Sequence, residues 1–175
     1  EDYIAANAIL INLVFLSAFI LDAYAFSTAG MVGYSLGKKD IGLFKKIVKN
    51  SFILSTFTGL IISIIYFFIN KYVITLMSDI ESIRNLSSSY VVWLILMPLI
   101  SSFCYQFDGI FIGASQTKEL RNAMIFSVFS YLALSLFLTE AMGNSGIWIS
   151  LCLFMILRAF SLLYYMDKIY LRFKN

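Results

Sequence analysis

The sequence predicts an all-α integral membrane protein in which five helices cross the bilayer as a single transmembrane domain, residues 1–175. Of the 175 residues, 61% are hydrophobic and only 13% are charged, whereas about a quarter of residues in soluble domains are charged. The chain is also divided into apolar runs, most of them near the roughly 20 residues that a bilayer requires. The five expected spans cover residues 4–36, 47–69, 90–114, 123–138 and 147–166.

The composition also narrows the chemistry. There is no His, so no imidazole can act as proton shuttle or metal ligand. Cys104 and Cys152 lie inside apolar runs and are expected to be buried small residues, not a disulfide or a metal pair. No metal-ligand cluster or nucleophile–base set is visible, so we expect no enzyme, cofactor or metal. The net charge of +3 comes from short clusters between apolar runs and does not predict nucleic-acid binding.

The first expected span, residues 4–36, is longer than a bilayer requires, so it should tilt or protrude. Asp22 lies in its interior. The span should end at Gly37, because glycine is a favourable C-terminal cap. Small residues at every fourth position predict close helix contact, namely Ala25, Ala29, Gly33 and Gly37.

Five lysines follow between residues 38 and 49 and have two interpretations. Positive segments as a rule face the cytoplasm, which predicts a cytoplasmic loop. Binding of anionic lipid headgroups is the functional alternative.

The second span, residues 47–69, carries another row of small residues that predicts helix packing: Ser51, Ser55, Gly59 and Ser63. Residues 70–89 show no positive excess. They are expected to form an external segment with a short interfacial helix.

The third span, residues 90–114, is the one around which we expect the others to pack. Pro98, the single proline, predicts a kink. Asp108 lies in an apolar, aromatic stretch, where a carboxylate is costly and by default marks a functional site. Gly109 and Gly113 are four residues apart and allow close helix approach. Helical spacing places these polar or small residues on one face: Ser101, Tyr105, Asp108 and Gly109.

The segments between the spans alternate between many and few basic residues along the chain, and the last two spans fit this pattern. The fourth contains three serines that suit interhelical hydrogen bonds, and the fifth has Arg158 at its middle. Two basic residues, Lys71 and Arg84, lie in segments expected outside. The N-terminus is therefore expected outside and the C-terminus in the cytoplasm. The internal segments hold ten: Lys38, Lys39, Lys45, Lys46, Lys49, Lys118, Arg121, Lys168, Arg172 and Lys174.

Three ionisable residues lie well inside spans: Asp22, Asp108 and Arg158. One cation cannot neutralise two carboxylates, so one acid is free to bind a proton or Na⁺. Asp22 lies nearer the middle of its span, which favours an Asp22–Arg158 pair and leaves Asp108 as the spare acid. The alternative is a static salt-bridge network that fixes helix packing.

Aromatic side chains flank these acids and define a candidate cavity for an organic cation. Aromatic rings beside a carboxylate suit a lipophilic cation, because the ring faces attract positive charge through cation–π interactions. The same rings would serve equally well for ordinary packing. The expected lining is Tyr24, Phe26, Tyr105, Gln106 and Phe107.

Three stretches resemble the multidrug and toxic compound extrusion (MATE) transporters, in the branch related to the DNA-damage-inducible F proteins. They are LDAYAFSTAGMVGYSLGKKD from Leu21, FDGIFIGASQTKELRNAM from Phe107 and GIWISLCLFMILRAFSL from Gly146. The resemblance implies twelve spans in two six-helix lobes around a cavity that opens alternately to either side. This chain is similar to spans eight to twelve, so the partner lobe and span seven lie outside it.

The resemblance also implies a function. It implies that the protein lies in the lipid bilayer of a bacterial inner membrane. It also implies export of small organic, often cationic, solutes, driven by H⁺ or Na⁺. Asp22 and Asp108 match acidic positions of this branch. Relatives often have an acid where this chain has Ala29 and a glutamine where it has Tyr34.

Two other functions remain open at this point. A lipid-linked sugar flippase of the wider superfamily would be expected to line its cavity with several basic residues. A membrane scaffold would have no transport cycle. We expect that these five spans do not function alone, because half of the cavity wall lies outside them.

Overall fold

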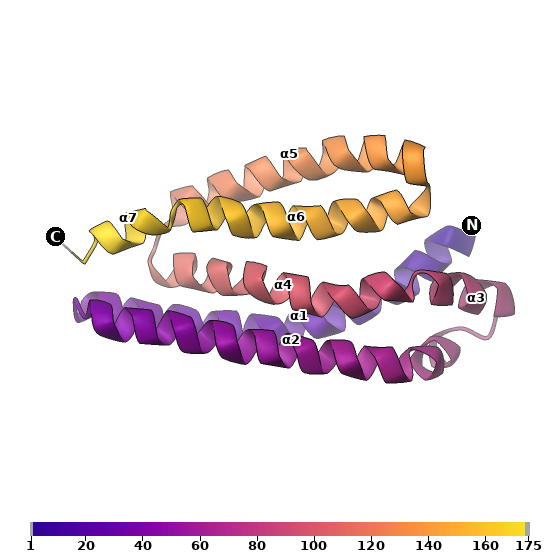
Figure 1. Ribbon diagram of the computed structural model, residues 1–175, viewed down its shortest axis with the longest axis horizontal. Helices are drawn as coiled ribbons and strands as arrows, with labels where there is room; N and C mark the ends of the chain where they lie inside the picture. Colours follow the sequence, from indigo (N-terminus) through magenta and orange to yellow (C-terminus); the bar gives the residue numbers. More distant parts are fainter. Residues whose placement is uncertain (1, 174–175) are drawn as a thin grey trace.

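The computed structural model describes residues 2–173, and helices make up nearly all of that range (Figure 1). Five helices are long and apolar enough to cross a membrane, which confirms the all-α fold class and the expected number of spans. The short helix expected before the third span is α3. The helices are α1 (Asp2–Gly37), α2 (Ile41–Met77), α3 (Glu81–Ser89), α4 (Val91–Gly113), α5 (Thr117–Met142), α6 (Asn144–Tyr164) and α7 (Met166–Leu171).

The lysine-rich segment is a turn at residues 38–40 and helical from Ile41 on, so the expectation of a loop was wrong for most of the segment. Asp40 accepts a hydrogen bond from the Leu43 amide at 2.8 Å and caps the start of α2, a position that Asp favours. Helix α1 does end at Gly37. The left-handed residue of the turn is Lys39, however, with φ 53°, and the next amide donates to the Ser35 carbonyl.

Helix α5 is also longer than its expected span, so the loop after it is short. Helix α5 runs to Met142 and α6 starts at Asn144. Gly143 makes this sharp turn with φ 59°, a backbone conformation that glycine adopts without steric cost. A Cβ on Gly146 would lie 2.2 Å from the Leu138 carbonyl oxygen, so this glycine allows α5 and α6 to approach closely.

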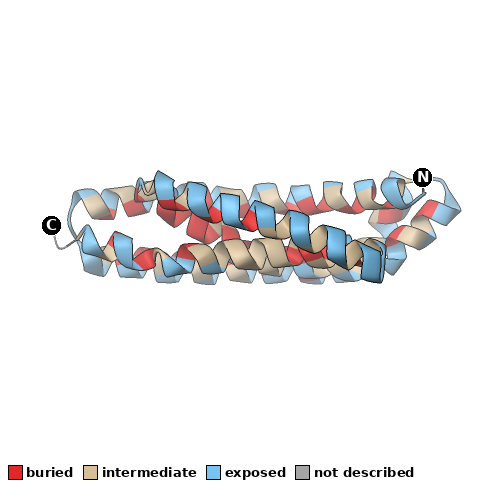
Figure 2. Cartoon of the chain, turned by 90° about the horizontal axis from the view of Figure 1, so that it is seen from above, coloured by how far each residue is buried: buried red, intermediate tan, exposed pale blue. Residues whose placement is uncertain are grey.

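Helix α4 is the centre of the bundle, as the sequence predicted. It contacts α1 and α2 on one side and α5 and α6 on the other, and it lies between these two pairs in Figure 1. Helices α1, α4 and α6 run in the same direction, and α2 and α5 run back (Figure 1). Buried positions face the interior and exposed positions cover the outside (Figure 2).

The contact between α1 and α4 is made by backbone against backbone. A Cβ added to Gly109 would lie 2.3 Å from the Ala25 carbonyl oxygen, and one on Gly113 would lie 2.3 Å from that of Ala29. No larger residue fits at either glycine without movement of α1. The predicted small-residue face is therefore confirmed as the α1–α4 interface.

The small residues of α2 pack against α4 in the same way. A Cβ on Gly59 would lie 2.8 Å from the Pro98 carbonyl oxygen, and α4 continues through Pro98 without a break. Ser51, Ser55 and Ser63 are buried on this side of α2. The row predicted for packing is confirmed.

Both ends of the bundle are held by specific contacts. At one end, Asn7 exchanges hydrogen bonds with Asn144 at 2.6 and 3.0 Å and accepts one from the Trp148 indole at 3.0 Å. At the other end, Arg172 donates to the Ala114 carbonyl at the end of α4. Phe44 there packs on Tyr170 and Phe173 with ring centroids 5.6 and 5.1 Å apart, and Lys168 pairs with Glu119 at 2.8 Å. Cys104 and Cys152 are free and buried, as predicted.

Candidate functional site

A buried ion pair joins α4 to α6 and forms the core of the candidate site. Arg158 Nη2 lies 2.9 Å from Asp108 Oδ2. Asp108 is 7% exposed, and the charge of Arg158 compensates much of the cost of burying it. The pair forms because α4 and α6 are direct neighbours.

The ion pair leaves polar atoms without partners. Asp108 Oδ1 and Arg158 Nε are both buried and make no hydrogen bond to any residue that the structure describes. Buried polar atoms are usually paired, and an unpaired one calls for an explanation such as a bound ion, proton or water. Asp108 Oδ1 therefore remains available as an acceptor.

Asp22 is the acid without an ion pair, so the expected Asp22–Arg158 pair was wrong. Within residues 2–173 it forms no salt bridge, although its charge acts on both Asp108 and Arg158. The reason is that α6 packs on α4 along this part of the bundle, whereas its hydrogen bonds to α1 are made at Asn7, near the start of α1 and about four turns from Asp22. Asp22 is half-buried on α1, and it takes the place of the spare acid.

Hydroxyl and amide groups extend the polar region from α1 toward α2 and α4. Thr28 Oγ1 donates to Gln106 Oε1 at 2.9 Å, and Gln106 is fully buried with its Nε2 unpaired. Thr58 Oγ1 donates to the Tyr24 hydroxyl at 2.9 Å. The signal for Thr28 and Thr58 was their polarity within apolar runs, but spacing alone did not show which helices they join.

The structure does not bring all five residues of the expected cavity lining together. Phe107 is buried and packs on Phe52 with ring centroids 5.0 Å apart. Phe26 is 70% exposed on α1, and Tyr105 is half-buried. Their role in binding a solute stays a prediction.

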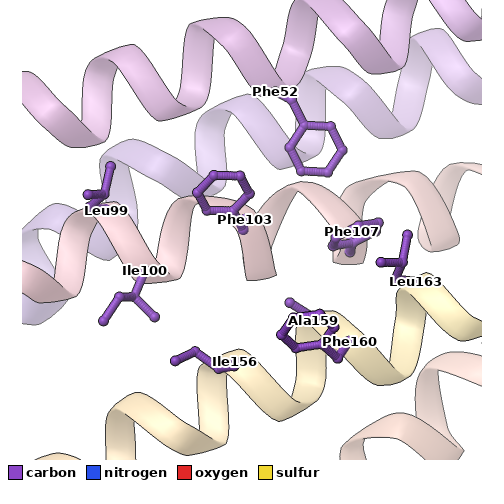
Figure 3. Close-up of a pocket in the computed structure, with 9 residues that line it drawn as sticks. All are labelled: Phe52, Leu99, Ile100, Phe103, Phe107, Ile156, Ala159, Phe160 and Leu163. Carbon is purple, nitrogen blue, oxygen red and sulfur yellow. The ribbon is translucent and has the colours of Figure 1, made fainter.

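An apolar pocket with a volume of about 580 Å³ lies between α2, α4 and α6. Phe107 is one of nine apolar side chains that line it, and the close-up shows Phe52 and Phe103 above and Phe160 below (Figure 3). None of the nine is charged, so this pocket is chemically separate from the ion pair.

Comparison with known proteins identifies the family of the chain. Residues 1–139 match the sequence profile of the MatE family. The chain belongs to the MatE family. Asp22 and Asp108 lie inside the matched residues of this MatE chain, and Arg158 lies beyond them.

One curated relative is a much longer protein than this chain. DNA damage-inducible protein F of Escherichia coli (strain K12) is 30% identical over 162 residues, which cover 93% of this chain and 35% of that protein. The MatE chain thus spans only about a third of its relative. No solved structure matched the chain.

Proposed function

We propose that this MatE chain forms most of one lobe of a secondary active antiporter, which exports organic, often cationic, solutes in exchange for H⁺ or Na⁺. The observation that carries the proposal is Asp22, an acid that forms no ion pair with any described residue and lies within electrostatic range of the buried Asp108–Arg158 pair. Acids at this depth are costly and are kept for ion or solute pathways.

The charge balance supports exchange. When all three groups are ionised, Asp22, Asp108 and Arg158 carry a net charge of −1, and one further cation neutralises them. Two cations at once would leave an excess positive charge in a poorly solvated region, which is unfavourable. A proton or Na⁺ and a cationic solute would therefore compete for the site, and competition of this kind couples the two fluxes.

The remaining groups have supporting roles in this proposal. Arg158 keeps Asp108 ionised and fixed, so that Asp22 is the group that changes its charge. The other lobe of the full protein would complete the cavity wall. The basic residues near α2 and α7 support a cytoplasmic position for this end of the bundle, in a bacterial inner membrane.

The other two functions have less support. A flippase for a lipid-linked sugar pyrophosphate would need several unpaired cations at the polar site. The described residues supply Arg158 there, and Asp108 neutralises it. A scaffold gives no reason to keep an unpaired acid on α1.

The test is transport by the full-length protein in everted membrane vesicles. We expect proton-driven uptake of a fluorescent organic cation, and Asp22→Asn should reduce its rate at least tenfold while the protein level is unchanged. Asp79→Asn, on the exposed segment before α3, is the matched control and should transport normally. Imposing a pH gradient or a Na⁺ gradient alone identifies the coupling ion. Equal transport by Asp22→Asn and wild type would exclude coupling through Asp22.

A further inference from the structure

The apolar groove between α2, α4 and α6 has the features of a lipid site, independent of the transport proposal. Its walls are aromatic and aliphatic side chains only. Phe103, Phe160 and Leu163 line it and are themselves 44%, 64% and 49% exposed, so the groove opens at the surface of the bundle. On a membrane helix such a surface faces acyl chains.

The length of the groove fits one leaflet. Along α4 its lining runs from Leu99 to Phe107, which is about 12 Å at 1.5 Å per residue. One leaflet contributes about half of the roughly 30 Å hydrocarbon thickness. On α4 the lining lies near the middle of the helix, but Phe52 lies near the start of α2 and Leu163 near the end of α6. On these two helices the groove extends toward the end of the bundle where α2 begins, so we assign it to the leaflet on that side.

Two lysines stand where the headgroup of such a lipid would lie. Lys49 and Lys45 precede Phe52, a groove residue, by three and seven positions on α2. This spacing places them on the same helix face as Phe52, one and two turns closer to the end of the bundle. Both are exposed and form no ion pair with any residue that the structure describes.

We propose that this groove binds an anionic phospholipid such as phosphatidylglycerol, with an acyl chain against Phe52, Phe103 and Phe160 and the phosphate against Lys45 and Lys49. The charge of the lysines complements a phosphodiester, and the apolar walls offer nothing to a polar solute. Each lysine near an anionic membrane surface strengthens binding by about fivefold. The site therefore selects anionic over zwitterionic lipid.

The test uses the full-length protein with the photoreactive residue p-benzoylphenylalanine in place of Phe103. The protein is reconstituted in vesicles of phosphatidylcholine and phosphatidylglycerol and irradiated, and the attached lipids are identified by mass spectrometry. The reference is the same residue in place of Phe129, which is 69% exposed on α5. We expect the attached phosphatidylglycerol-to-phosphatidylcholine ratio to be at least fivefold higher at position 103.

Two pairs of variants separate this site from general attraction to a basic protein. Lys45→Gln with Lys49→Gln should lower the ratio at position 103 to that at position 129. Lys46→Gln with Lys118→Gln removes the same charge from other faces and should leave the ratio unchanged. Equal ratios at the two positions in the unaltered protein would overturn the proposal. So would attachment of position 103 to a peptide of the same protein, because another helix would then fill the groove.

Discussion

Helices α4 and α5 are both apolar spans of similar hydropathy, yet they occupy opposite environments. In the most apolar stretch of α4, 61% of residues are buried inside the bundle, against 11% in α5. Helix α4 contacts four spans, whereas α5 packs chiefly on α6. Hydropathy identifies a membrane span but does not say which of its faces meets protein.

Small and polar residues account for the difference between the two helices. Lipid tails are as apolar as leucine, so burying leucine against another helix brings little hydrophobic gain. The glycines of α4 allow backbone contact with α1, and Asp108 requires a partner. Helix α5 has only Ser127 and two residues near its start buried, and its phenylalanines are exposed.

The strongest test of this contrast is Arg158→Gln in the full-length protein. Asp108 would be left buried without its cation, and we expect a loss of about 3–5 kcal/mol in the free energy of unfolding. Denaturant titration in detergent micelles measures it. Adding Asp108→Asn to Arg158→Gln removes the uncompensated charge and should recover most of the loss. No recovery would mean that Arg158 acts through packing alone.

The close backbone contact between α1 and α4 is tested by alanine substitution of one glycine on α4 and, as the control, one glycine on α1. Gly109→Ala places a methyl group against the Ala25 backbone, which cannot move without displacing α1, so we expect a loss of about 1–3 kcal/mol. Gly30→Ala meets nothing within 4 Å and should be neutral or stabilising, because alanine favours helix. Equal midpoints for the two variants in the same micelle titration would contradict a tight α1–α4 interface.

The smallest expected effect on the free energy of unfolding comes from a comparison of two phenylalanines. Phe111 on α4 is fully buried and Phe129 on α5 is 69% exposed. Phe111→Ala should cost about 2 kcal/mol, less than in a soluble core because lipid removes most of the transfer contribution. Phe129→Ala should change the unfolding free energy by less than about 0.5 kcal/mol. A comparable loss at both positions would show that α5 is covered by another part of the full protein.

Much of the fold could be predicted from the sequence, because its signals are local. Apolar runs gave the five spans, and the four-residue spacing of Ala25, Ala29 and the α4 glycines gave the α1–α4 interface. Charges inside spans identified Asp22, Asp108 and Arg158. The partner of Arg158 was not predictable in the same way, because depth along each helix does not show which helices are neighbours.

Two other features of the structure differ from what the sequence predicts, and each difference has a physical cause. The lysine segment is helical from Ile41 on, because Asp40 caps the helix and lysine is compatible with helix, although its charge pattern is that of a cytoplasmic segment. The sequence predicts the same cavity-lining role for Phe26 and Phe107, yet Phe26 is exposed and Phe107 is buried. Aromatic rings are stable against both lipid and protein, so their direction depends on the final packing.

The ion pair between Asp108 and Arg158 also sets an order of events during biosynthesis. Arg158 follows Asp108 by fifty residues and lies two spans later, so the acid reaches the translocon well before its partner has been made. Until then α4 carries a carboxylate with no counter-ion, and quality-control proteases can recognise it. A full-length protein cut short after α5 should therefore be degraded faster than one ending after α7, and pulse-chase labelling would measure the difference.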